Sequence, residues 1–312
     1  MRRARRGTTP ALRRPCQVSG AALLLLALLL VAFTVIGSEP AAAQPTTEVT
    51  DAERELAERY APVLMLVAHP EECSDGEPFG PMTVDAVLGN PQVALRQLGN
   101  GDPVVMWGPT ARDLHGLRAG FYLDFPGRAL SPGCLYERDY RDYTSGRRPT
   151  IYAHVVTQPD EPGLLALQYW FYWYFNDWND KHESDWEGIQ LVFEATSAEE
   201  ALRVEPTSVG YAQHEGGERA DWDGAKLDRI GTHPVVYSSA GSHASYFGSA
   251  LFLGRSAREG FGCDNTDGPS VRVDPDVVVL PDRVDDPAHP HAWLQFHGRW
   301  GEHHGGVFNA PD

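Results

Sequence analysis

The sequence predicts an all-β protein with a few short helices, built as an antiparallel β-sandwich. From residue 150 onward, short runs rich in Val, Ile, Tyr, Phe and Trp alternate with Gly, Pro, Asn and Asp, which is the pattern of strands joined by tight turns. Within residues 168–194, two apolar runs flank one polar loop, and this arrangement predicts a β-hairpin. A chain of this size can fold as one large all-β domain or as two small ones.

Residues 1–43 are predicted to be a targeting segment. Six arginines precede an apolar run at residues 21–36, and three alanines at residues 41–43 supply the small side chains that a signal peptidase needs. The run approaches the length of about 17 to 25 residues that spans a bilayer, so a cleaved signal peptide and an uncleaved signal anchor both fit. The arginines stay on the cytoplasmic side in either case. We therefore expect an exported protein that is extracellular or part of the cell envelope.

Residues 44–59 are predicted to form a linker and a short helix, and residues 60–312 a single β-sandwich domain. Thr50 and Glu53 have the spacing of a capping box, which starts a helix that ends near Arg59. Further short helices are expected at residues 83–88, at residues 111–117 and after Ser197. The expected strands are residues 63–67, 151–157, 164–175, 186–195, 204–213, 234–239, 242–252, 271–280 and 293–298.

The charge balance argues against nucleic acid and anionic lipid as direct electrostatic partners. The chain carries a formal net charge of −17, and removal of residues 1–43 takes away six Arg and one Glu, which brings the charge to about −22. Phosphate backbones and anionic headgroups are repelled by such a protein. A bound cation could bridge this repulsion, and the N-terminal apolar segment offers a separate means of membrane association.

Three cysteines follow the targeting segment, at positions 73, 134 and 263. In an oxidising compartment we expect two of them to form a disulfide bond and one to be left over. Cys73 and Cys134 both lie in predicted loops of the N-terminal third, so they are the expected pair. Three buried, reduced thiols are the alternative.

The hairpin contains the strongest candidate site. His182, Asp185 and Glu187 stand at H-x-x-D-x-E spacing, and Asp185 and Glu187 point to the same face of a strand because side-chain direction repeats every second residue. Asp177 and Asp180, in the preceding loop, could complete the set. Carboxylates with one imidazole favour a hard cation such as Mg²⁺, Ca²⁺ or Mn²⁺, with Zn²⁺ a weaker match. The alternative is a solvated loop whose carboxylates pair with nearby basic side chains.

Seven consecutive aromatic residues, 169–175, fill the first strand of the hairpin. Alternation divides them between two faces, with Tyr169, Phe171, Trp173 and Phe175 on one and Trp170, Tyr172 and Tyr174 on the other. Packing between two layers explains one face. Rings left on the other face could form an exposed platform that stacks on sugar or lipid headgroups.

Two further histidines are candidates for catalysis. His214 and His243 each stand beside small residues at the predicted end of a strand, where close backbone approach is allowed. Each could be a metal ligand, a general base or an orienting partner, and each could equally be a hydrogen-bonded structural histidine. Ser242 and His243 are not predicted to act as nucleophile and base, because neighbours on a strand point to opposite faces. The sequence contains no G-x-S-x-G, H-E-x-x-H, P-loop or dinucleotide-binding motif.

Seven short motifs stand in a recognisable order along the chain. They are YAP at residues 60–62, QYWF at 168–171, NDW at 176–178, HESDWE at 182–187, QHEG at 213–216, HPVVY at 233–237 and GSHA at 241–244. Together they resemble the vacuolar protein sorting-associated protein 62 family, over a region from about residue 60 to the end of the chain. The biochemical role of that family is poorly defined, so the resemblance implies a type of domain and no particular activity.

The aromatic strand, the Asp shortly after it and the heptapeptide KHESDWE at residues 181–187 are more distantly similar to the necrosis-inducing (NLP) cytolysins, which have G-H-R-H-D-W-E. This resemblance implies an NLP/actinoporin-like sandwich in which a divalent cation engages membrane sphingolipid glycans, with the ligands Asp177, His182, Asp185 and Glu187. The chain departs from the heptapeptide at Lys181 and Ser184, which replace its Gly and its second His. The fold and the metal site can therefore be shared without toxin activity.

Three classes of function are consistent with these observations. A binding module would keep an open cation position for a hydroxyl or carboxylate of an envelope or foreign glycan or glycolipid. A metal-dependent hydrolase would use His214 or His243 as the base for a cation-bound water. A structural envelope domain would use the cation only to stabilise a loop. We prefer the binding module, because the sequence lacks a catalytic signature.

Overall fold

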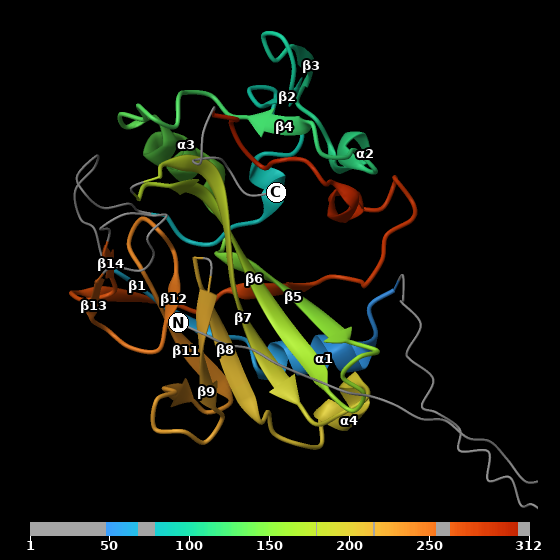
Figure 1. Cartoon of the computed structure of the whole chain (residues 1–312), viewed down its shortest axis with the longest axis vertical. Helices are drawn as coiled ribbons and strands as arrows, with labels where there is room; N and C mark the ends of the chain where they lie inside the picture. Colours follow the sequence, from blue (N-terminus) through green and yellow to red (C-terminus); the bar gives the residue numbers. More distant parts are fainter. Residues whose placement is uncertain (1–47, 68–78, 179, 215, 254–262, 305–312) are drawn as a thin grey trace, which may run out of the picture. The chain divides into compact units, whose positions relative to one another are not determined.

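The long hairpin predicted for residues 168–194 forms the centre of the larger β-sheet (Figure 1). The computed structural model describes residues 48–67, 79–178, 180–214, 216–253 and 263–304. Within them, six strands run in the order β16-β5-β6-β7-β8-β9. Their bounds are Thr150–Thr157 for β5, Leu165–Asn176 for β6, His182–Phe193 for β7, Ser208–Gln213 for β8, Gly216–Asp221 for β9 and Asp276–Val279 for β16. The predicted targeting segment, residues 1–43, lies outside the described residues.

A second sheet has the strand order β10-β11-β1-β15, with β12 paired to β11. Its strands are β1 Val63–Val67, β10 Arg229–Ile230, β11 His233–Ser238, β12 Ser245–Tyr246 and β15 Ser270–Val273. Strand β1 runs parallel to β11, and β16 runs parallel to β5, whereas the other strand pairs of the described residues are antiparallel. Parallel pairing needs a long connection, and here it joins strands that are far apart in the sequence.

Smaller elements complete the fold. A three-stranded sheet has the order β3-β2-β4, and a two-stranded sheet joins β13 to β14. Their bounds are β2 Ala94–Gln97, β3 Val104–Trp107, β4 Phe121–Asp124, β13 Leu251–Leu253 and β14 Cys263–Asn265. The helices are α1 Asp51–Arg59, η1 Val84–Ala86, α2 Ala111–Leu114, α3 Leu135–Thr144, α4 Ala198–Ala201 and η2 Ala292–Gln295. The predicted all-β class with a few short helices is confirmed.

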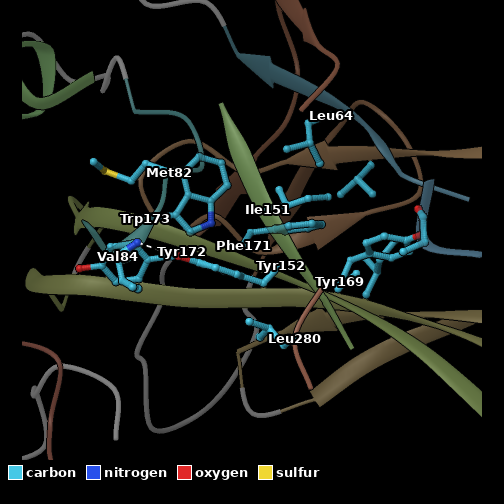
Figure 2. Close-up of a cluster of buried hydrophobic side chains, with 14 of the residues drawn as sticks. Leu64, Met82, Val84, Ile151, Tyr152, Tyr169, Phe171, Tyr172, Trp173 and Leu280 are labelled. Atoms are coloured by element: carbon cyan, nitrogen blue, oxygen red, sulfur yellow. Dashed lines mark hydrogen bonds between the residues drawn. The ribbon is translucent and has the colours of Figure 1, made fainter. Parts of the chain in front are cut away.

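One apolar cluster combines side chains from both large sheets (Figure 2). It contains Tyr169, Phe171 and Trp173 of β6 together with Leu64 of β1 and Val236 of β11. Figure 2 also shows Tyr152 of β5 beside Val84, whose backbone N–H donates to the Tyr152 hydroxyl across 2.9 Å. Burial of apolar area contributes about 25 cal/mol per Å², so aromatic residues this large dominate the stability of the hairpin.

The aromatic run of β6 is buried on both faces except at Trp170, which is 40% exposed. Tyr172 packs against Trp300 from the C-terminal part of the chain, with ring centroids 5.8 Å apart. Tyr174 stacks on Phe125, just after β4, at 5.1 Å. The exposed platform expected for this face is therefore limited to one ring, because segments distant in sequence cover the others.

Local capping signals are confirmed by the structure. The Thr50 hydroxyl accepts from the backbone N–H of Glu53, and the Glu53 carboxylate accepts from the backbone N–H of Thr50, so α1 begins with a capping box. Ser197 caps α4 by accepting from the backbone N–H of Glu200. In contrast, α3 and the sheet of β2, β3 and β4 were not predicted. None of the helices in the described part of the chain has the length and apolar character needed to span a bilayer.

Three of the expected strands are wrong. Residues 271–280 are split by Pro275 into β15 and β16, which join different sheets, because Pro has no N–H for a ladder. Residues 242–252 begin with a turn at His243, whose φ of 57° is incompatible with a strand. Residues 293–298 include the end of η2 and contain no strand.

Of the two cysteines in the predicted Cys73–Cys134 disulfide, only Cys134 lies among the described residues. Cys134, next to the start of α3, is disulfide-bonded. Cys73 lies outside the described residues, so its pairing with Cys134 stays a prediction. Cys263, at the start of β14, is a free and exposed thiol, which agrees with the expectation that one cysteine is left over.

Candidate functional site

The candidate residues lie at the end of the β6–β7 hairpin that carries the polar loop. His182 is the first residue of β7, Asp185 faces Trp173 across the hairpin, and Glu187 faces Phe171. Because cross-strand partners share a face, Asp185 and Glu187 both point toward the core side of the sheet, as their spacing predicts. The side chains of His182, Asp185 and Glu187 are all buried.

A backbone hydrogen bond holds the ring of His182. Its Nδ1 lies 2.6 Å from the carbonyl oxygen of Ser184. A carbonyl oxygen can only accept, so Nδ1 carries the proton and donates it, and Nε2 of the neutral ring keeps a lone pair. Metal-binding histidines commonly donate their other ring N–H to a carbonyl or carboxylate in this way. His182 therefore has the tautomer of a metal ligand.

Asp185 accepts hydrogen bonds from three different residues. Its Oδ2 accepts from His243 Nδ1 across 2.9 Å and from Asn176 Nδ2 across 3.1 Å, and its Oδ1 accepts from the backbone N–H of Trp186 across 3.0 Å. Burial opposes ionisation of this carboxyl. The hydrogen bonds from His243 and from Asn176 nevertheless hold the pKa of Asp185 below its usual range. Asp185 is thus a buried anion with protein partners already in place.

The two aspartates of the loop between β6 and β7 differ in their partners. Asp177 forms a salt bridge with Lys181, and its backbone N–H donates to the carbonyl of Gly241 across 3.2 Å. The Oδ1 atom of Asp180 is buried and has no hydrogen-bond partner in the described structure. A buried carboxylate oxygen without a partner is costly. A hydrogen-bond donor or a cation beside Asp180 Oδ1 would therefore stabilise the loop.

The chemistry of these donors fits a hard divalent cation, but their arrangement is incomplete. No three His, Cys, Asp or Glu side chains among the described residues stand ready to hold an ion. The ammonium group of Lys181 neutralises Asp177, which the resemblance to the NLP cytolysins assigns as a ligand. His182 and Asp180 still offer atoms to a cation. The four-residue set of Asp177, His182, Asp185 and Glu187 stays a prediction.

A second buried carboxylate, Asp264 of β14, collects hydrogen bonds from four side chains. His214 Nε2 donates to Oδ2 across 2.8 Å, and the Tyr246 hydroxyl donates to the same oxygen across 2.5 Å. The Oδ1 atom accepts from Ser242 across 2.6 Å and from Ser239 across 3.4 Å. Burial opposes ionisation, but these donors, led by His214, hold the pKa of Asp264 below its usual range. Sequence reasoning did not identify Asp264, because no local motif surrounds it.

Both candidate catalytic histidines are engaged by a carboxylate. His243 is completely buried, and its ring stacks on Trp173 at a centroid distance of 4.2 Å. The Ser242 hydroxyl donates to Asp264, so it does not donate to an imidazole. A general base must reach the proton that it removes, and His243 has no exposed surface from which to do so. The arrangement suits orientation and stability better than acid–base chemistry.

Unusual backbone conformations gather at this end of the hairpin. Among the described residues, Ser184, His214, His243 and Asp102 are the non-glycine residues with positive φ. The first three belong to or adjoin the candidate site, with φ values of 54°, 52° and 57°. Such conformations cost of order 1–3 kcal/mol each and often occur at functional sites. Positive φ at Ser or His has no sequence signature, so it was not predicted.

Glu183 is a further buried carboxyl that sequence reasoning missed. It accepts from the Tyr136 hydroxyl across 2.7 Å and from the backbone N–H groups of Phe125 and Glu302 across 3.0 Å and 2.8 Å. Burial raises the pKa of Glu183 to about 8, although the donors at Phe125 and Tyr136 favour its ionised form. Glu183 ties β7 to α3, to the end of β4 and to the C-terminal part of the chain.

Solved structures of NLP proteins are among those that match the chain, all with low identity. A structure described as NLPPya in complex with glucosamine has a TM-score of 0.38 and 13% identity, and the match covers 76% of this chain and 77% of that one. The non-toxic HaNLP3 protein has a TM-score of 0.37 and 11% identity, with 77% and 82% covered. Necrosis and ethylene inducing protein 2, from the causal agent of cocoa's witches' broom disease, has a TM-score of 0.31 and 13% identity, with 77% of each chain covered.

No individual curated protein matches the chain. A protein-family model, in contrast, matches the second half of the hairpin and most of the chain after it. Residues 179–304 match the model of the family described as vacuolar protein sorting-associated protein 62. The motifs at residues 60–62, 168–171 and 176–178 precede that match. The candidate site, with His182, Asp185, Glu187, His214 and His243, thus lies in the segment of the chain that matches the vacuolar protein sorting-associated protein 62 family model.

Proposed function

We propose that the protein binds a divalent cation at the start of β7 and uses it to hold a hydroxyl-bearing ligand of the glycan or glycolipid class. The orientation of His182 carries this proposal. Its Nδ1–H donates to the Ser184 carbonyl, so Nε2 of the neutral ring keeps a lone pair that a cation can accept. An imidazole nitrogen and carboxylate oxygens are ligands that divalent cations accept.

Acidic groups near this ring support a cation as the occupant. Glu187 is buried on the same strand face as Asp185, and Asp180 Oδ1 is buried in the adjoining loop without a hydrogen-bond partner among the described residues. The chain as a whole has a formal net charge of −17, which attracts cations and repels anionic ligands. A bound cation would give Asp180 Oδ1 the partner that it lacks among the described residues.

Lys181 is the competitor for this site. Its ammonium group pairs with Asp177, so an entering cation would have to separate the two before Asp177 could become a ligand. When bound, the cation would accept hydroxyl oxygens of the ligand as further ligands. We also propose that the protein is exported, on the basis of the arginine-rich and apolar segment at residues 1–43.

A hydrolase is supported less well. His243 is completely buried between Asp185 and Trp173, and the Nε2 atom of His214 donates to Asp264. The ring of His243 therefore cannot reach a cation-bound water, and the ring of His214 is oriented by Asp264. In the structural alternative, the cation only stabilises the loop. Measuring glycan binding with and without chelator distinguishes this alternative from the binding module.

The test uses thermal melting and terbium luminescence on the full chain. Tb³⁺ replaces Ca²⁺ at oxygen-rich sites, and Trp173 and Trp178 lie near enough to the loop to sensitise it. We expect Ca²⁺, Mg²⁺ or Mn²⁺ to raise the melting temperature and EDTA to reverse the rise, because a ligand that binds only the folded state stabilises it. His182→Gln should abolish the effect. His233→Gln is the matched control, since His233 Nδ1 makes the same kind of bond, to the Ala61 carbonyl across 2.7 Å.

The outcomes separate the alternatives. If cations and chelator leave the melting temperature and luminescence unchanged, the cation proposal is wrong. If they change it but glycan binding on an array is the same with EDTA, the cation is structural. Glycan binding that requires both the cation and His182 supports the full proposal.

A further inference from the structure

A cavity of about 320 Å³ lies on the opposite face of the β6–β7 hairpin from Asp185 and Glu187. Four tryptophans line it: Trp170, Trp186, Trp293 and Trp300. We propose that this cavity is a binding site for an uncharged saccharide and that it works independently of the cation. The proposal therefore goes beyond the function proposed above and does not rest on it.

The floor of the cavity is a rigid set of rings. Trp186 stacks on Trp293 with centroids 6.0 Å apart and meets Trp300 edge to face at 5.7 Å. Trp293 and Trp300 are themselves in edge-to-face contact at 5.6 Å. Rings that are fixed by one another lose little conformational freedom when a ligand binds. The cavity is therefore formed before a ligand arrives.

Trp170 forms the exposed wall. It stands directly across the hairpin from Gly188, and a Cβ at Gly188 would lie 3.5 Å from the indole atom Cε3 and 2.7 Å from the Tyr169 carbonyl oxygen. The approach to the Tyr169 carbonyl oxygen excludes a side chain at Gly188, so the indole of Trp170 lies beside bare backbone of the neighbouring strand. Its Nε1 donates to Gln168 Oε1 across 3.3 Å. The ring is held in place, yet 40% of the residue remains exposed.

Polar groups stand at the edge of the same cavity. His154 Nε2 and Asp282 Oδ1 lie 2.9 Å apart, both side chains are partly exposed, and both line the cavity. Gln295 of η2 also lines it. Together they provide hydrogen-bond donors and acceptors within reach of the aromatic floor. Ligand pockets commonly combine an apolar, aromatic lining with a few polar groups in this way, at volumes of about 300–1,000 Å³.

A sugar ring matches this combination of surfaces. One face of a pyranose presents C–H groups that stack on an indole, and its edge presents hydroxyl groups that bond to carboxylate, imidazole and amide groups. An acyl chain would leave Asp282 and His154 without polar partners from the ligand. A phosphate or sulfate would be repelled by Asp282 and by the net charge of −17. An uncharged saccharide can stack on the tryptophan rings and also form hydrogen bonds with His154, Asp282 and Gln295.

The test measures quenching of tryptophan fluorescence and saturation-transfer NMR on the full chain with cellobiose, maltose and lactose. We expect at least one disaccharide to bind saturably, equally with and without EDTA. Trp170→Ala should weaken binding by about tenfold or more, and Asp282→Asn should weaken it less. Trp107→Ala is the matched control, because Trp107 on β3 is also exposed, at 58%, and does not line the cavity.

Three results would overturn the proposal. They are no saturable binding of any disaccharide to the native chain, equal binding by Trp170→Ala and Trp107→Ala, and binding that EDTA abolishes. The last would assign saccharide binding to the cation site. Binding that survives EDTA and His182→Gln but fails in Trp170→Ala supports the cavity even if the cation proposal is wrong.

Discussion

His243 and Asp185 form a buried hydrogen-bonded pair between two segments that are 58 residues apart in the sequence. The Nδ1 atom of His243 donates to Asp185 Oδ2 across 2.9 Å, and the imidazole stacks on Trp173 with an interplanar angle of 5°. The pair joins β7 to the turn after β11. It therefore couples the candidate cation site to the segment that also supplies Ser242 to Asp264.

Loss of His243 is expected to destabilise the fold strongly. His243→Ala leaves Asp185 as a buried charge without its main partner, and breaking such a pair costs about 3–5 kcal/mol. His154→Ala is the matched control, because His154 and Asp282 are also 2.9 Å apart but are partly exposed, and exposed pairs contribute about 0–1 kcal/mol. Urea denaturation measures both. Equal losses in the two variants would show that burial of the His243 pair has no energetic consequence.

His243→Asn should recover part of the stability that His243→Ala loses. The backbone at His243 has a φ of 57°, which Asn adopts more readily than Ala, and the Asn side-chain amide can donate to a carboxylate. The same urea measurement tests this. An Asn variant no more stable than the Ala variant would contradict the explanation from backbone strain and donor loss.

Glu183→Gln is expected to be tolerated, whereas Glu183→Ala is not. Burial raises the pKa of Glu183 to about 8, so a neutral side chain already suits the site near neutral pH, and Gln keeps an acceptor for Phe125 and Glu302. Ala leaves those two N–H groups and the Tyr136 hydroxyl without their acceptor, at about 1–3 kcal/mol for each unsatisfied group. Calorimetric melting of the two variants at pH 7 measures the difference. Similar melting temperatures would contradict a hydrogen-bonding role.

Asp264 is expected to make the protein sensitive to acid. Its folded pKa is lowered by His214, Ser242 and Tyr246, so its contribution is present above the unfolded pKa of about 3.9 and is lost as pH falls through the lower folded pKa. Melting temperatures between about pH 5 and pH 2.5 measure this loss. Asp264→Asn should be less stable at pH 5 and should approach the native protein at the acid end. Parallel pH profiles would contradict it.

Lys181→Ala is expected to increase affinity for a divalent cation. The variant removes the ammonium group that pairs with Asp177, so the cation no longer competes with it, and a gain of about 1 kcal/mol corresponds to about fivefold tighter binding. Lys226→Ala is the control, because Lys226 pairs with Glu218 on β9, away from the hairpin loop. Tb³⁺ titration compares the two variants. Unchanged or weaker affinity in Lys181→Ala would remove Asp177 from the ligand set.

Much of the hairpin was predictable because its information is local. The alternation of residues 169–175 predicted which rings share a face, and the spacing of Asp185 and Glu187 predicted that both point to one side. The capping box at Thr50 predicted α1. These features depend on neighbours within four residues, and period-two geometry or a single helical turn decides them.

The partners of the candidate site were not predictable in the same way. Asp185 meets His243, His214 meets Asp264, and Glu183 meets Tyr136, at separations of 47 to 58 residues. No spacing rule connects residues so far apart. The positive φ of His243 could not be predicted either, because a histidine in the sequence does not indicate that conformation.

The sequence by itself determined the strand faces, the short capped helix and the gathering of His182, Asp185 and Glu187 at one end of a hairpin. Only the tertiary structure decided that Lys181 neutralises Asp177, that His243 is enclosed beneath Trp173, and that the C-terminal part of the chain turns the second aromatic face of β6 into a tryptophan-lined cavity. The physical reason is that side-chain direction follows from the local backbone, whereas burial and ion pairing depend on which distant segments pack against it.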